Sequence, residues 1–134
     1  ILINSGNANV FTGKKGEKSI NKIVSFLSMK LKVDKKEIYI ASTGVIGELL
    51  DERKIIKSLP SLISDLNNNN QSWLKAANAI RTTDKFPKII SESYKKCEDK
   101  IIINGIAKGS GMIAPNMATM LSFISSNINI LKNK

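Results

Sequence analysis

The sequence predicts an α+β fold, and three observations lead to this prediction. Apolar residues recur at helical spacing over residues 17–31. Two β-prone runs, residues 89–94 and 101–104, flank a short charged turn, as expected for an antiparallel pair of strands. With 134 residues, the chain has the length of one ordinary domain. Helices mixed with antiparallel strands are typical of the α+β class.

The first half of the chain begins with a predicted strand, residues 1–3, and a polar loop, residues 4–9. The helix over residues 17–31 comes next, and a short strand over residues 38–41 ends in Ser42-Thr43-Gly44. Because the chain opens at an apolar strand without an initiator methionine, we expect it to be a fragment of a longer protein.

A helix near residues 52–59 should be interrupted by Pro60, with a second amphipathic stretch reaching Leu66. The asparagine run, residues 67–70, predicts a loop, and Ser72 is the expected N-cap of a helix that ends near Ile80.

The second half continues with the two strands of the predicted hairpin, whose turn lies around Cys97. A glycine-rich segment, residues 105–111, follows the hairpin, and a further β-prone run begins at Thr119. Several strands in the second half and helices in the first are consistent with the α+β prediction.

The formal net charge of +10 does not by itself predict nucleic-acid binding. The charge is scattered, and 19 of the 21 basic residues are lysines. Arginine, present as Arg53 and Arg81, is the residue that makes bidentate contacts with phosphates and bases. Aromatic residues are dispersed too, so the sequence predicts no stacking platform for bases. We expect no nucleic-acid partner.

The sequence has no stretch with the length of a membrane span and no signal-peptide pattern. Its single cysteine, Cys97, cannot form an internal disulfide, and we assign it no role. We therefore expect a soluble, cytoplasmic protein with no membrane partner.

The chain contains no histidine. Within the chain, this excludes Ser-His-Asp triads, Cys-His dyads and histidine-based metal sites, and a single cysteine excludes thiolate zinc sites. A nucleophile must then be activated without imidazole. A threonine at a chain N-terminus meets this condition, because its α-amine titrates near pH ~7.7 and can accept the hydroxyl proton. An internal cut would be needed to create such a threonine here.

The segment over residues 105–121 has the features that such a cut requires. Its glycines and Pro115 permit a strained backbone, and the small Ala118 leaves its own carbonyl open to attack by the Thr119 hydroxyl. The Lys-Gly-Ser-Gly-Met and Ala-Thr-Met-Leu motifs of this segment resemble the self-cleavage site of the ornithine acetyltransferase family. These are the bifunctional glutamate N-acetyltransferases of arginine biosynthesis, which cut themselves before the threonine of Ala-Thr-Met-Leu.

Three further segments resemble the same family in the same order, namely residues 4–9 with Thr12-Gly13, residues 42–48, and residues 79–84 with Pro87-Lys88. The resemblance covers the whole chain. It implies part of a two-sheet sandwich flanked by helix layers, an N-terminal-nucleophile-like fold assembled from both cleavage products. It also implies that residues 1–118 are the C-terminal part of an alpha chain and residues 119–134 the start of a beta chain, within one incomplete domain.

The resemblance also implies roles for five residues. Thr119 matches the nucleophile, which contacts substrate as well, and the cleaved bond joins Ala118 to Thr119. Thr43 and Gly44 match the oxyanion-hole pair, and Lys108 and Thr82 match substrate-binding residues. Without the resemblance, Thr119 would be a strand residue, Thr43-Gly44 an ordinary turn, Lys108 a solvated charge and Thr82 a residue at a helix end, with Asp84 capping the next element of the chain.

The family's reaction moves an acetyl group from N2-acetyl-L-ornithine to L-glutamate through an acetyl-threonine, releases ornithine and needs no metal or bound organic cofactor. The resemblance leaves open whether acetyl-CoA is a second acetyl donor. It implies alpha and beta chains from one precursor, two of each in a heterotetramer. We expect this fragment alone to be inactive, because much of the site lies in the missing beta chain. The alternatives are a self-cleaving aminopeptidase of related fold and an inactive basic binding fragment.

Overall fold

The computed structural model describes residues 1–96, 99–109 and 119–129 and divides the chain into two compact units. The first unit is Ile1–Ser72 and the second is Trp73–Lys134. Each unit has its own sheet and is described by itself. Helices and strands are mixed, so the predicted α+β class is confirmed.

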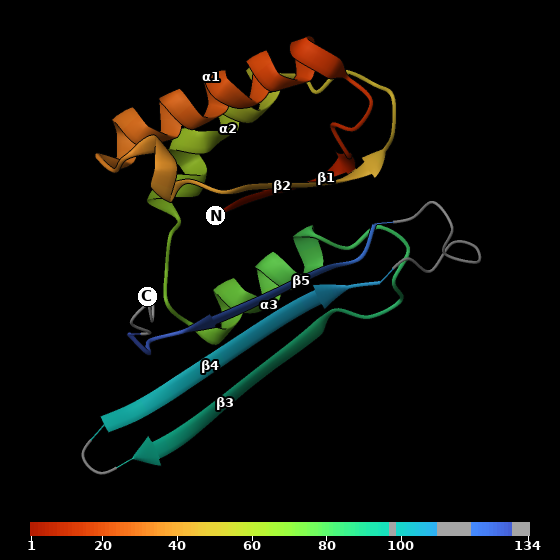
Figure 1. The fold of residues 1–134 in the computed structure, drawn as a ribbon. Coiled ribbons are helices and arrows are strands. Elements are labelled where there is room, and N and C mark those ends of the chain that lie inside the picture. Colours follow the sequence, from red (N-terminus) through yellow and green to blue (C-terminus); the bar gives the residue numbers. More distant parts are fainter. Residues whose placement is uncertain (97–98, 110–118, 130–134) are drawn as a thin grey trace, which may run out of the picture. The chain divides into compact units, whose positions relative to one another are not determined.

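The first unit is a parallel pair of strands covered by helices (Figure 1). β1 (Leu2–Asn7) and β2 (Ile40–Val45) pair in parallel, and α1 (Gly13–Leu31) forms the crossover between them. The 3-10 turn η1 (Lys35–Glu37) leads into β2, and α2 (Glu52–Ser64) follows it. In Figure 1, α1 and α2 lie on the same face of the sheet, as the apolar stripe of α1 requires.

The core of this unit lies between the two helices and the sheet. Ile23 and Leu27 of α1 meet Leu59 of α2 and Leu50, which precedes α2. Leu2 and Ile40, one from each strand, pack against this cluster. Burial of a large apolar side chain stabilises a fold by about 1.5–3 kcal/mol, so each of these residues helps to hold the helices on the sheet.

Two predictions about this unit are wrong. Residues 4–7 are not a loop but the second half of β1, because their backbone pairs with β2 and the polar side chain of Asn4 accepts a hydrogen bond from Ser42. Pro60 does not interrupt the helix, since α2 runs through it to Ser64. A proline inside a helix costs roughly 3 kcal/mol, and packing of Leu59 and Ile63 on both sides of it offsets this cost.

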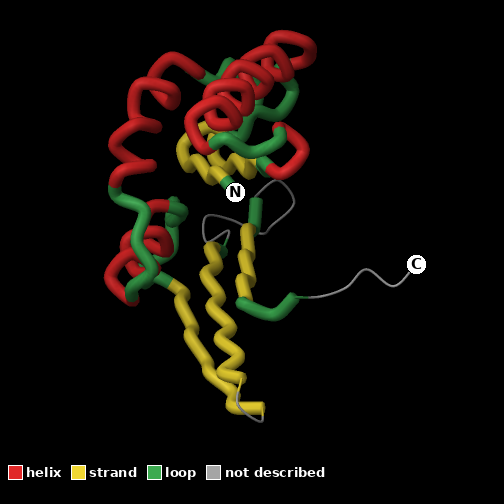
Figure 2. The backbone as a smooth tube through the Cα atoms, turned by 90° about the vertical axis from the view of Figure 1, so that its left-hand side faces the viewer, coloured by secondary structure: helices red, strands yellow, loops and turns green. Residues whose placement is uncertain are grey.

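The second unit is a three-stranded antiparallel sheet in the order β3-β4-β5, with a helix beside it (Figures 1 and 2). α3 (Asn70–Ala79) begins at the boundary between the units, and β3 (Lys88–Lys96) and β4 (Asp99–Lys108) form the predicted hairpin. β5 (Leu121–Ser126) pairs with β4. The hairpin prediction is confirmed, while its turn residues Cys97 and Glu98 lie outside the described residues.

Two element boundaries in this unit differ from the sequence predictions. Helix α3 starts before Ser72, because the side chain of Asn69 accepts a hydrogen bond from the Ser72 N–H and so caps the helix. The strand predicted over residues 101–104 continues through Gly105, which lies within β4 and pairs with Ile90 and Ile124. Hydrogen-bonded strands on both sides hold this part of the glycine-rich segment in the sheet.

Candidate active site

The end of the β4–β5 pair brings the predicted nucleophile close to the predicted substrate lysine. Lys108, the last residue of β4, pairs with Leu121, the first residue of β5. Thr119 precedes Leu121 by two positions and is half-buried. Because the strands are antiparallel, Thr119 and Lys108 lie at the same end of the sheet.

Lys108 is buried rather than solvated. Its side chain is 5% exposed, and its Nζ donates a hydrogen bond to the Thr82 Oγ1 over 3.0 Å. The plainer interpretation of Lys108 as a solvated surface charge is therefore wrong. A buried ammonium is costly unless polar groups surround it, so a lysine in this position points to a specific use for its charge. The structure thus brings the two predicted substrate residues into direct contact.

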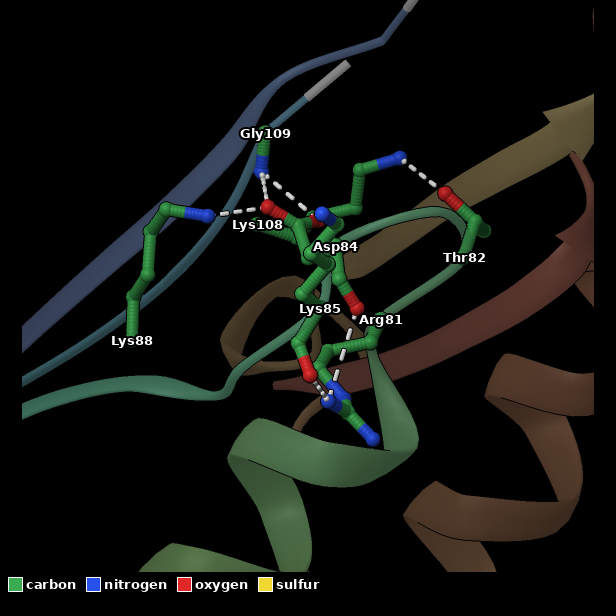
Figure 3. Close-up of polar contacts among 7 residues, drawn as sticks. All are labelled: Arg81, Thr82, Asp84, Lys85, Lys88, Lys108 and Gly109. Carbon is green, nitrogen blue, oxygen red and sulfur yellow. Dashed lines mark hydrogen bonds and ion pairs between the residues drawn. The ribbon is translucent and has the colours of Figure 1, made fainter. Parts of the chain in front are cut away.

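The turn that carries Thr82 is held from its helix side by Arg81. The Arg81 Nη1 donates hydrogen bonds to the backbone carbonyls of Lys85, at 2.8 Å, and of Asp84, at 3.4 Å (Figure 3). Arg81 itself follows directly after α3 and the buried Ile80. The turn is thereby tied to the end of a helix, which positions Thr82.

Asp84 joins the same turn to β4, a role that sequence reasoning missed. Both carboxylate oxygens accept hydrogen bonds from the Gly109 N–H, each over 3.0 Å, and Oδ1 also forms an ion pair with Lys88 (Figure 3). The hydrogen bond from Lys88 contributes most to lowering the pKa of Asp84 below its usual value; the Gly109 N–H and the charges of Lys88 and Lys108 lower it further, against the effect of burial. Asp84 is therefore ionised at neutral pH.

One sequence signal could have identified Asp84. It is the only acidic residue between Asp65 and Glu92, in a chain with a large excess of lysine. An isolated carboxylate beside the two threonines of the Arg-Thr-Thr-Asp motif is a candidate partner for nearby cations or N–H groups. Asp84 does more than cap the next element: it pairs with Lys88, the first residue of β3, and it also accepts the N–H of Gly109, which follows β4.

Thr43 and Gly44 belong to the first unit, near the carboxyl end of β2. The Thr43 side chain is 1% exposed, and Gly44 has a φ of +132°, which L side chains rarely adopt. A Cβ on Gly44 would lie 2.6 Å from the backbone N of Asn7, so the paired strand also demands glycine here. The backbone geometry therefore requires glycine at 44, next to the buried Thr43.

A network of side-chain amides and hydroxyls holds the neighbouring backbone. The Ser42 Oγ donates to the Asn4 Oδ1 over 2.6 Å, and the Asn4 Nδ2 donates to the Asn7 carbonyl over 2.9 Å. The Asn7 Nδ2 in turn donates to the Glu48 carbonyl over 3.0 Å. These bonds connect β1, β2 and the loop after β2, so the carboxyl ends of both strands are fixed around Gly44.

An apolar cavity of about 420 Å³ lies at the other end of this sheet. Its lining includes Leu2 and Ile38, at the amino ends of the strands, together with Leu27, Leu59 and Glu37. None of the predicted site residues lines it. The cavity is therefore separate from the predicted catalytic and substrate-binding residues.

The predicted site residues fall into two groups. Thr119, Lys108 and Thr82 lie in the second unit, Thr43 and Gly44 lie in the first, and Ala118 lies outside the described residues. Over the described part of the chain, no group of three or more His, Cys, Asp or Glu side chains could hold a metal ion. No helix among the described residues is long and apolar enough to cross a membrane.

A family model and several relatives match the chain over all or nearly all of its length. The model of the ArgJ family matches residues 1–134. The arginine biosynthesis bifunctional protein ArgJ of Bartonella henselae is 51% identical over 130 residues, which are 97% of this chain and 31% of that protein. The protein of the same name from Gluconobacter oxydans is 42% identical over 133 residues, which are 99% of this chain and 31% of the relative. The chain thus spans about a third of the length of these relatives.

A solved structure shares the fold. The crystal structure of the arginine biosynthesis bifunctional protein ArgJ from Bacillus halodurans aligns with a TM-score of 0.71 at 29% sequence identity. The alignment covers 89% of this chain and 60% of that one. The similarity confirms the predicted N-terminal-nucleophile-like fold.

Proposed function

The chain belongs to the ArgJ family, and on that premise we propose that it is the part of a cytoplasmic acetyltransferase that spans its self-cleavage site. The proposed full-length protein transfers the acetyl group of N2-acetyl-L-ornithine to L-glutamate. The observation that carries the proposal is the buried Lys108, hydrogen-bonded to Thr82 at the end of the sheet where Thr119 lies two residues before the last strand.

The proposed maturation step creates the nucleophile. The Thr119 hydroxyl attacks the Ala118 carbonyl, and the peptide bond is replaced by an ester that water hydrolyses. Residues up to Ala118 then end an alpha chain, and Thr119 begins a beta chain with a free α-amine. That amine can accept the proton of its own hydroxyl near neutral pH, in a chain that has no histidine to do so.

In the proposed transfer, the Thr119 Oγ attacks the acetyl carbonyl of N-acetylornithine. Donors at Thr43 and Gly44 stabilise the oxyanion of the tetrahedral intermediate. The C–N bond then breaks, ornithine leaves with a proton, and the acetyl group stays on Thr119 as an ester. The amine of glutamate attacks this ester, gives N-acetylglutamate and returns the hydroxyl to Thr119.

Lys108 and Thr82 are proposed to bind substrate. Both substrates carry carboxylates, and an ammonium held beside a hydroxyl offers a fixed cation with a neighbouring donor. The proposal needs no metal or organic cofactor. It includes a heterotetramer of two alpha and two beta chains, with acetyl-CoA as a second acetyl donor to be tested.

The decisive experiment is intact mass spectrometry of the full-length protein together with an acetyl-transfer assay. We expect wild type to give two chains, the second beginning at Thr119, and to transfer acetyl with ping-pong kinetics. Thr119→Ala should remain one chain and lose activity by several orders of magnitude. Ser122→Ala, which removes a hydroxyl three residues away on β5, is the matched control and should cleave and react like wild type.

Three outcomes would contradict the proposal. An uncut wild type with full activity would exclude the N-terminal threonine mechanism. Peptide hydrolysis without acetyl transfer would favour the aminopeptidase alternative. Salt-dependent binding to DNA without either reaction would favour the basic binding fragment.

A further inference from the structure

The turn over residues 81–87 meets the end of β4 at two consecutive residues: Lys108, the last residue of β4, and Gly109, which follows it. Thr82 accepts the hydrogen bond from the Lys108 side chain, and Asp84 accepts the Gly109 N–H with both oxygens (Figure 3). Because Lys108 and Gly109 are adjacent, a restraint on the Gly109 backbone also restricts where the Lys108 side chain can lie. Asp84 therefore acts on Lys108 through the main chain.

The contact between Asp84 and Gly109 is part-buried and charge-assisted. The Asp84 side chain is 5% exposed, and its carboxylate is also paired with Lys88. Hydrogen bonds to an ionised acceptor are roughly twice as strong as neutral ones. A Cβ on Gly109 would lie 3.0 Å from the Asp84 Oδ1, closer than most real contacts, so this approach favours glycine at 109.

Arg81 fixes the backbone of the turn, so the Asp84 carboxylate is held in place where it contacts Gly109. Arg81 donates hydrogen bonds to the carbonyls of both Asp84 and Lys85. Figure 3 shows the Arg81 guanidinium beneath the turn and the Asp84 carboxylate reaching across to Gly109. Arg81, just after α3, therefore holds the turn, and Asp84 of the turn holds Gly109 at the end of β4.

We propose that Asp84 is a positioning residue for this site: by holding the backbone of Gly109, it places the Lys108 ammonium beside Thr82 at the sheet end that leads on to Thr119. The inference rests on the proposed function, because it takes Lys108 as the substrate-binding cation. Asp84 itself does not touch the substrate. Supporting residues of this kind matter because a displacement of about 1 Å can cost up to 100-fold in rate.

The test compares full-length Asp84→Ala, Asp84→Asn and wild type. In the cleaved, folded protein we expect Asp84→Ala to raise KM for N-acetylornithine about 10-fold or more, because Lys108 loses its fixed place. Asp84→Asn keeps one side-chain oxygen that can accept the Gly109 N–H, so it should fall between the other two. Glu92→Gln removes a negative charge from the exposed β3 of the same unit and should behave like wild type.

A purely structural role for Asp84 predicts a different result. The yield and melting temperature of Asp84→Ala would then fall, while KM and kcat of the cleaved, folded fraction stayed within about twofold of wild type. That outcome would overturn the inference. If Asp84→Ala does not fold, Gly109→Ala disturbs the same contact from the residue after β4 and should raise KM in the same way, whereas an unchanged KM would overturn the inference.

A second readout separates this inference from the proposed function. Hydrogen exchange at the Gly109 amide needs no substrate, and we expect Asp84→Ala to accelerate it about 10-fold or more. If wild type transfers acetyl and Thr119→Ala does not, but Asp84→Ala matches wild type in KM and in exchange, the inference alone fails. If wild type transfers no acetyl, the proposed function fails, and unchanged Gly109 exchange in Asp84→Ala would overturn the inference as well.

Discussion

The two units of the chain differ in the kind of contact that stabilises each of them. The first unit has an apolar cluster built on Ile23 and Leu59, both nearly inaccessible to solvent. In the second unit, Ile80 and Ile106 are buried, but the sheet leaves apolar side chains such as Ile90 and Ile124 exposed. Hydrogen bonds and an ion pair hold the residues at its site end. The Thr43-Gly44 pair thus stands on a packed scaffold, whereas Lys108 is placed by hydrogen bonds and charge.

This difference has a physical consequence for mutation. Truncating a packed apolar side chain lowers the free energy of unfolding, because each methyl group that is removed leaves a cavity. Polar contacts contribute less to stability but are directional, so their loss displaces a group without unfolding the protein. The first unit should therefore respond to substitution mainly in stability, and the site end of the second unit mainly in function.

The largest expected stability effect is that of Ile23→Ala. Ile23 is 0% exposed in the core of the first unit, and its truncation should destabilise that unit by about 2–5 kcal/mol. The matched variant Ile124→Ala truncates a residue that is 77% exposed and should cost no more than about 0.5 kcal/mol. Hydrogen exchange of α1 and of β4 in the full-length protein measures each unit separately. Equal losses in both variants would contradict the contrast between the units.

A smaller effect is expected from glycine substitutions in the two sheets. Gly44→Ala should cost about 1–3 kcal/mol through backbone strain and also reduce acetyl transfer, since it pushes against the backbone of β1. Gly105→Ala meets the Ile90 Cγ2 at 3.1 Å, and that exposed side chain can move aside, so the change should stay within about 1 kcal/mol. Denaturant unfolding of both variants checks the order. If Gly105→Ala lowers the free energy of unfolding more than Gly44→Ala does, the second sheet is the more closely packed of the two.

The smallest effect concerns an ion pair that joins α1 to α2. Glu52 accepts hydrogen bonds from the Lys22 Nζ at 2.7 Å and the Ser19 Oγ at 2.9 Å. The hydrogen bond from Lys22 contributes most to lowering the pKa of Glu52 from 4.5 to about 2, followed by those from the Glu52 backbone N–H and from Ser19. A carboxylate with a depressed folded-state pKa contributes stability above its unfolded value and loses it as the pH falls. The contribution should therefore disappear between about pH 5 and pH 2.

Glu52→Gln tests this pH dependence. Its melting temperature should fall less steeply than that of wild type between about pH 5 and pH 2, because the variant has no carboxylate to protonate. Glu17→Gln, at an exposed position of α1, is the control and should keep the wild-type slope. If Glu52→Gln and wild type have the same slope, the ion pair does not stabilise the first unit.

Local sequence patterns were sufficient to predict the elements that depend on interactions between residues close in sequence. The helical spacing of residues 17–31 led to α1, and the two isoleucine-rich runs led to the β3–β4 hairpin, because periodicity and short turns are properties of adjacent residues. The order of the motifs also sufficed to indicate the family, and the type of nucleophile stays a prediction. Roles for Thr119, Thr43, Gly44, Thr82 and Lys108 remain predictions on that basis.

Contacts between distant residues decided the rest. Residues 4–7 form a strand only because β2 pairs with them, and α2 continues through Pro60 only because the core packs on both sides. The motif singled out Lys108, but only the structure shows that it is buried and bonded to Thr82, and that Asp84 accepts the N–H of Gly109. The free energy of these contacts comes from partners about 25 to 40 positions away, which no local pattern of residues contains.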